Sequence, residues 1–208
     1  MRRIILLGVL SVLSTGLGAA VPGYRHEMSD QDKATLDRVS DYLNSLHTLK
    51  ANFVQIGPEG QVDEGTFWLD KPGRMRFEYA APNPTLVVSD GSQVAVENKQ
   101  LQTVDRYPLW STPLNLILSN DINLKKDPAI AGVEHQPGEL IVQARAHSDK
   151  VSGDITLVFA EPTLELRQWT VVDAQGLATT VSIRGVQTGL PVDPTLFTIP
   201  AVPTKQAG

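Results

Sequence analysis

The chain has 208 residues, with 23 Asp or Glu against 18 Lys or Arg and a formal net charge of −5. An acidic balance gives no net attraction for nucleic-acid phosphates or anionic lipid headgroups, so we expect no nucleic-acid partner. The sequence contains no cysteine. Disulfides, thiolate metal sites and a lipidated N-terminal cysteine are therefore excluded.

The first twenty residues have the layout of a cleavable secretory signal. Two arginines precede the apolar run Ile4–Leu13, and small residues follow it up to Ala20. The run is shorter than the roughly 17 to 25 residues that span a bilayer, so cleavage is favoured over a retained anchor. We expect residues 1–20 to be a signal peptide and residues 21–208 to form one soluble domain in the periplasm. Cleavage removes two arginines and no acid, which changes the net charge from −5 to −7.

A long amphipathic helix is predicted to begin near Ser29, because Ser29 and Asp32 have the spacing of a capping box. Its apolar positions recur at helical spacing: Leu36, Val39, Leu43 and Leu46. Its polar face carries Asp37, Arg38, Asp41 and Asn44. From Leu49 the apolar residues alternate with polar ones, which predicts the first strand.

Turn signals then follow every 8 to 12 residues, the spacing typical of an antiparallel strand meander. The earlier turns are Gly57–Gly60, Lys71–Gly73, Ala81–Pro84, Asp90–Gly91 and Asn98–Gln100. Strands are predicted at Thr66–Leu69, Arg74–Tyr79, Glu139–Ala146, Gly153–Ala160, Leu164–Asp173 and Ala178–Val186. Within Arg74–Tyr79, alternation places Arg74, Arg76 and Glu78 on a face that we expect to be hydrated.

A second, two-turn helix is predicted at Pro113–Leu118, with Thr112 as its N-cap. About ten strands and two helices indicate an α+β, mainly β fold. A sheet that wide tends to curl, and two helices cannot cover its apolar face. The inner face is then either packed against itself or left as a cavity for a small molecule or lipid.

The sequence shows no recognisable catalytic pattern. His26, His47, His135 and His147 lack the spacing of a metal site, so we expect no bound metal. Neither a Gly-x-Ser-x-Gly elbow nor a phosphate-binding glycine loop is present. The three tryptophans are interpreted as core or pocket walls. We therefore expect neither an enzyme nor a cofactor.

Several segments occur in the order found in one family of proteins. They are Phe53-x-Gln55, Gly65-x-Phe67-Trp68-Leu69, Lys71–Tyr79, Pro82, Val87–Gly91, Thr112–Leu118 and Asp193–Pro200. In this order and spacing the chain resembles the periplasmic outer-membrane lipoprotein carrier family, LolA. The resemblance implies an incomplete barrel, in which a curved antiparallel sheet surrounds an apolar cavity closed by helices.

The resemblance also implies a function and its partners. The chain would act as a monomer, taking acylated lipoproteins from an inner-membrane lipoprotein-releasing ABC transporter to the outer membrane, where an acceptor could receive them. The alternative is a module of the same fold that senses or stores lipid or an envelope protein without transporting it.

The resemblance assigns candidate residues as well. We expect acyl chains to contact the apolar sheet residues Phe67, Leu69, Met75, Phe77 and Tyr79, and Leu114, Ile117 and Leu118 under the lid. The alternative is that these residues form an ordinary closed core. In the family, an arginine before the proline of the Lys71–Gly73 turn latches the lid helices. Lys71 keeps the charge but lacks the planar guanidinium, so it is either a weaker latch or a solvated turn residue.

Overall fold

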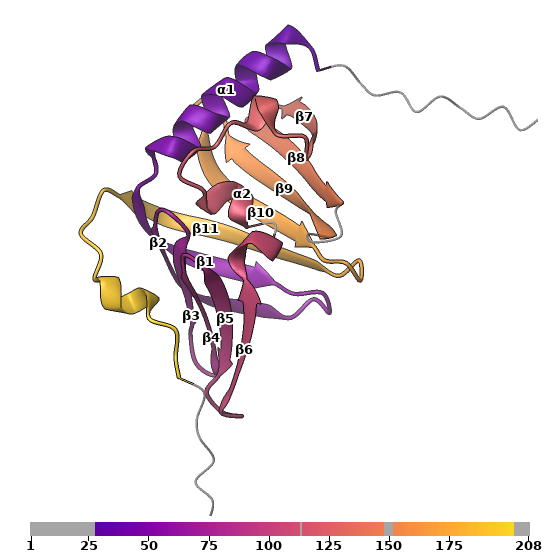
Figure 1. Ribbon diagram of the computed structural model, residues 1–208. Helices are drawn as coiled ribbons and strands as arrows, with labels where there is room; N and C mark the ends of the chain where they lie inside the picture. The colour runs from indigo at the N-terminus through magenta and orange to yellow at the C-terminus, as the bar shows by residue number, and fades with distance from the viewer. Residues whose placement is uncertain (1–27, 113, 148–151, 202–208) are drawn as a thin grey trace, which may run out of the picture.

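The computed structural model describes residues 28–112, 114–147 and 152–201 (Figure 1). The expected signal peptide, Pro113 and the segment 148–151 lie outside the described residues. The architecture is mainly β, as predicted: a single eleven-stranded antiparallel sheet with few helices. No helix among the described residues is long and apolar enough to cross a membrane.

The sheet is built from two meanders that meet in its middle. The first contains β1 (Thr48–Ile56), β2 (Val62–Asp70), β3 (Arg74–Tyr79), β4 (Thr85–Asp90), β5 (Gln93–Asn98) and β6 (Thr103–Pro108). The second contains β7 (Ile130–Gln136), β8 (Glu139–His147), β9 (Ser152–Ala160), β10 (Glu165–Val172) and β11 (Ala178–Thr188). The spatial order is β6-β5-β4-β3-β2-β1-β11-β10-β9-β8-β7. The first and last strands therefore pair at the centre, and β6 and β7 form the two edges.

Helix α1 (Asp30–Ser45) lies across one end of the curved sheet (Figure 1). Its predicted capping box is confirmed, because the Ser29 hydroxyl accepts from the Asp32 amide and the Asp32 carboxylate accepts from the Ser29 amide. The predicted apolar stripe of Leu36, Val39 and Leu43 is buried. The helix therefore begins where the capping box predicts, and its apolar stripe faces the interior of the protein.

The connector, residues 109–129 between β6 and β7, carries three short helices: η1 (Leu109–Ser111), α2 (Asn115–Leu118) and η2 (Leu124–Lys126). The two-turn helix predicted here is wrong in length, since α2 has four residues. Thr112 is not its N-cap. The cap position is Leu114 and makes no side-chain bond, whereas the Thr112 hydroxyl donates to Leu109 O. The helix is therefore stabilised by packing, because Ile117 and Leu118 are buried.

The C-terminal helix η3 (Pro194–Phe197) packs on the outer face of β3 and β4. The guanidinium of Arg76 donates to Leu196 O at 3.1 Å, and that of Arg74 lies 5.8 Å from the ring centre of Phe197. The expectation that this strand face is hydrated is wrong for Arg76, whose side chain is 15% exposed, whereas the side chains of Arg74 and Glu78 are 36% and 42% exposed. The reason is that a distant segment covers the face, which alternation within a strand does not reveal.

Candidate functional site

Five aromatic side chains form a continuous cluster on the inner face of the sheet. Phe67 and Phe77 are directly paired across β2 and β3, with ring centres 4.5 Å apart. The ring of Phe53 on β1 meets those of Phe77 and Tyr79 edge-on at 5.2 and 5.1 Å. Trp169 on β10 approaches Phe67 at 5.7 Å and Phe77 at 6.1 Å. The cluster thereby joins the two meanders across the centre of the sheet.

The strand spacing brings the predicted aliphatic residues to the same face. Leu69 pairs with Met75 two positions along the ladder from Phe67 and Phe77, and both are buried. From the connector, Ile117 and Leu118 are buried in the same cluster, whereas Leu114 is half-buried against it. The predicted site residues therefore meet in one apolar layer between the sheet and the helices.

A polar group at the edge of this layer is Tyr79, whose hydroxyl donates to Gln55 Oε1 at 2.7 Å. Burial raises the pKa of Tyr79 to about 12, so its hydroxyl remains neutral at physiological pH. Gly65 lies opposite both Phe53 and Tyr79 in the ladders, and a Cβ there would stand 2.8 Å from the Phe53 ring and 2.1 Å from Glu78 O. Glycine at this position therefore leaves room for the Phe53 ring and for the neighbouring strand.

Lys71 lies in the turn between β2 and β3 and reaches the C-terminal end of α1. Its Nζ donates to Leu43 O at 2.7 Å, and its backbone amide donates to His47 O at 2.8 Å. A cation at a helix C-terminus is favourable, because the last carbonyls carry partial negative charge. Lys71 is 9% exposed, and this burial lowers its pKa to about 8. The ammonium is therefore still mostly protonated at pH 7 and donates to the helix.

The same turn also contacts α2. Gly73 N donates to Leu118 O at 2.9 Å, so two residues of this turn, Lys71 and Gly73, hold the ends of both helices. Gly73 has φ +72°, and a Cβ at this position would lie 2.7 Å from Gly91 Cα and 3.1 Å from a methyl carbon of Leu109. Only glycine fits both the backbone conformation and the space here.

Tyr42 makes a separate contact between α1 and the second meander. Its ring meets Phe159 edge-on at 6.0 Å, and its hydroxyl accepts from Leu166 N at 3.1 Å, beside the register shift in β10. Burial raises the pKa of the Tyr42 hydroxyl, which therefore stays neutral. The sequence pattern alone does not single out Tyr42, because it lies outside the apolar stripe of the helix.

Two members of the aromatic cluster, Phe53 and Trp169, were not among the predicted site residues. The alternation of β1 and β10 places both side chains inside, but only the pairing of β1 with β11 brings Trp169 next to β2. Among the described residues, no group of three or more His, Asp or Glu side chains is placed to hold a metal ion.

The chain matches the family model described as "Outer membrane lipoprotein carrier protein LolA" over residues 44–200. It is 27% identical to the outer-membrane lipoprotein carrier protein of Dechloromonas aromatica over 205 residues, covering 93% of this chain and 94% of that protein. The carrier protein of Methylococcus capsulatus is 27% identical over 178 residues, covering 81% and 85%. A solved LolA superfamily protein from Nitrosomonas europaea aligns at 10% identity with a TM-score of 0.47, covering 80% of this chain and 97% of that one.

Proposed function

Because this chain belongs to the outer membrane lipoprotein carrier protein family LolA, we propose that it is a periplasmic carrier that binds the acyl chains of lipoproteins released from the inner membrane and delivers them to the outer membrane. An inner-membrane ABC transporter would load it, and an outer-membrane acceptor could unload it. The proposal is one of binding and release by a monomer, without catalysis or a cofactor.

The physical need for such a carrier follows from the cargo. Three acyl chains hold on the order of 45 methylenes, and exposing them to water costs roughly 35 kcal/mol at about 0.8 kcal/mol each. A carrier must bury much of that surface and later release it. Non-directional apolar contact meets both requirements. It keeps the acyl chains out of water, and the chains lose little free energy when they move from the carrier to another apolar environment.

The observation that supports the proposal is the continuous apolar layer between a very wide sheet and two helices. Acyl chains would contact Phe67, Leu69, Met75, Phe77 and Tyr79 from the sheet, with Leu114, Ile117 and Leu118 above them. Most of these side chains are buried against one another. Cargo would therefore enter as the helices separate from the sheet, and Lys71 would act as the latch that holds them closed.

A direct test uses Trp169 as a reporter, since it is 2% exposed within the aromatic cluster. Replacing Trp68 and Trp110 by Phe leaves Trp169 as the single tryptophan of the three in the chain. A triacylated lipopeptide with brominated acyl chains should quench its emission by direct contact, and an unbrominated lipopeptide is the control. A protein that shows no quenching and no bound lipopeptide by native mass spectrometry would contradict the proposal.

A second measurement compares two added carboxylates. Met75→Glu places a charge in the apolar layer, whereas Gln187→Glu places one on an exposed position of β11. Since burying an unpaired charge is costly, we expect Met75→Glu to weaken lipopeptide binding at least about tenfold and Gln187→Glu to leave it unchanged. Complete unfolding of Met75→Glu would instead identify Met75 as ordinary core. Normal delivery of lipoproteins in a deletion strain would favour a sensor or storage role.

A further inference from the structure

We infer that Asn44 is a positioning residue that joins α1 to residues 115–126 of the connector, so that these parts move as one lid body when cargo enters. The inference rests on the proposed function, which requires the helices to leave the sheet. The moving element is then larger than either helix, because it contains both α1 and residues 115–126.

The side-chain amide of Asn44 pairs with the backbone of the connector in both directions. Asn44 Nδ2 donates to Ile122 O at 2.9 Å, and Ile122 N donates to Asn44 Oδ1 at 2.9 Å. This is the pairing that one strand would offer to another. Because residues 119–123 lie outside any helix or strand, Asn44 satisfies backbone groups that have no secondary-structure partner there.

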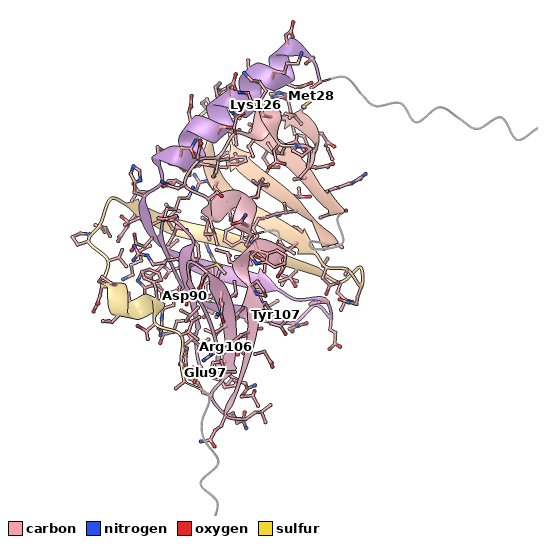
Figure 2. The ribbon with its side chains drawn as sticks, in the orientation of Figure 1. Met28, Asp90, Glu97, Arg106, Tyr107 and Lys126 are labelled. Carbon is pink, nitrogen blue, oxygen red and sulfur yellow. The ribbon has the colours of Figure 1, made fainter. Side chains whose placement is uncertain are left out.

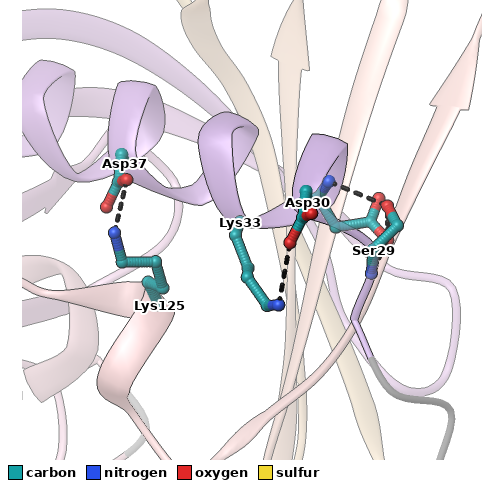
Figure 3. A network of polar contacts seen from close by, with 6 residues as sticks. Ser29, Asp30, Lys33, Asp37 and Lys125 are labelled. Atoms are coloured by element: carbon teal, nitrogen blue, oxygen red, sulfur yellow. Dashed lines mark hydrogen bonds and ion pairs between the residues drawn. The ribbon is translucent and has the colours of Figure 1, made fainter.

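Two further contacts lie on the same face of α1. The Ser40 hydroxyl accepts from Leu124 N at 3.0 Å and donates to Leu36 O at 2.6 Å. Asp37 pairs with Lys125 at 2.6 Å (Figure 3). Positions 37, 40 and 44 are separated by three and four residues and so form one stripe along a helix. The polar face of the helix thus binds the connector at Asp37 and Asn44.

The contacts within this body differ from those that hold it to β2 and β3. Inside it, the bonds run along the length of α1, and Ile122 and Leu124 are buried beneath them. Toward β2 and β3, the polar contacts come from a single turn, with Lys71 bound to Leu43 O and Gly73 bound to Leu118 O. Separation at that turn would free both helices from β2 and β3 together, because Asn44 keeps them attached to each other, while Tyr42 still holds α1 to β10.

The absence of cysteine from the chain allows spin labels to be placed at chosen pairs of sites. Asp41→Cys with Lys126→Cys, both exposed (Figure 2 labels Lys126), reports the distance between α1 and η2. Asp41→Cys with Gln187→Cys reports the distance between α1 and the sheet. On loading with a triacylated lipopeptide, double electron–electron resonance should show a changed α1–sheet distance and an unchanged α1–η2 distance. A changed α1–η2 distance, or a fixed α1–sheet distance in loaded protein, would overturn the inference.

Adding Asn44→Ala should make the α1–η2 distance broaden on loading. Asn44→Asp, which retains an acceptor for Ile122 N, should restore part of the narrow distribution. The label at Asp41 lies on the exposed side of α1 and leaves Asn44 intact, so the labelled protein with Asn44 is the matched control. An Asn44→Ala protein with the narrow distribution of the parent would show that Asn44 does not position the connector.

A measurement without cargo separates this inference from the proposed function. In the empty protein, Asn44→Ala removes the two hydrogen bonds to the backbone of Ile122. We therefore expect hydrogen exchange at the nearby Leu124 amide to become roughly tenfold faster, while exchange at β8 and β9 amides stays the same. Unchanged exchange at Leu124 would refute the role of Asn44 even if lipopeptide binds. Failure to bind lipopeptide, with faster exchange at Leu124, would refute the carrier function and leave the joined lid standing.

Discussion

Helix α1 is attached to the first meander by a charged side chain and to the second meander by an aromatic one. At the β2–β3 turn, a charged side chain extends from the sheet to Leu43 O on the helix. At β10, an aromatic ring extends from the helix to Phe159 and Leu166 on the sheet. A lysine can withdraw into water and keep its charge solvated, whereas withdrawing Tyr42 exposes apolar surface. The comparison indicates that the β2–β3 contact is the one suited to open.

The largest expected loss of stability comes from breaking the contact between Tyr42 and Phe159. Tyr42→Ala removes the ring that packs on Phe159 and the acceptor for Leu166 N, and should lower the free energy of unfolding by about 3 kcal/mol. Tyr42→Phe keeps the ring and should cost only about 1 kcal/mol. Urea denaturation of the three proteins measures both values. Equal losses for the two variants would show that the hydroxyl, and not the ring, carries the contact.

An intermediate effect is expected at the backbone of the turn. Gly73→Ala combines a left-handed φ with a Cβ 2.7 Å from Gly91 Cα, so it should lower stability by about 2 kcal/mol and weaken the contact with Leu118. Gly138→Ala is the matched control, because its φ is +82° but nothing lies within 4 Å of the added Cβ. It should cost about 1 kcal/mol from backbone strain alone. Thermal unfolding that does not distinguish the two variants would contradict the close approach.

The smallest expected effect concerns the charge on Lys71, whose pKa burial lowers to about 8 from 10.5. The unfolded chain therefore binds more protons than the folded protein above pH 8, so the free energy of unfolding should rise with pH. Between pH 7 and pH 9 the rise is about 1 kcal/mol. Lys71→Met should abolish it, while Lys99→Met on an exposed turn should not. A parent protein and a Lys71→Met variant with parallel pH profiles would contradict this account.

Much of the fold follows from local pattern. The capping box and apolar stripe of α1 and most of the hairpin turns are correct because their signals lie within a few neighbouring residues. The predicted strand ranges omit β4 and β5, and they also omit the two edge strands, β6 and β7. Their side chains are mostly exposed or half-buried, and an edge strand with little burial has little alternation to recognise.

The candidate site is only partly readable from the sequence for a related reason. Alternation alone places Phe67, Leu69, Met75 and Phe77 on one face, because neighbouring strands of a hairpin share a register. Trp169 joins them through the pairing of β1 with β11, and Leu43 O meets Lys71 through the path of α1. Neither contact can be predicted from the local sequence pattern, since each joins segments that are far apart in the chain.

The pairing of β1 with β11 also bears on how the protein reaches its folded state. Residues 48–56 acquire their second neighbour only when residues 178–188 are available, so the centre of the sheet closes last along the sequence. Contacts between such distant segments form slowly, because a long loop must close before they contribute. The N-terminal meander therefore cannot complete the sheet until residues 178–188 have been made.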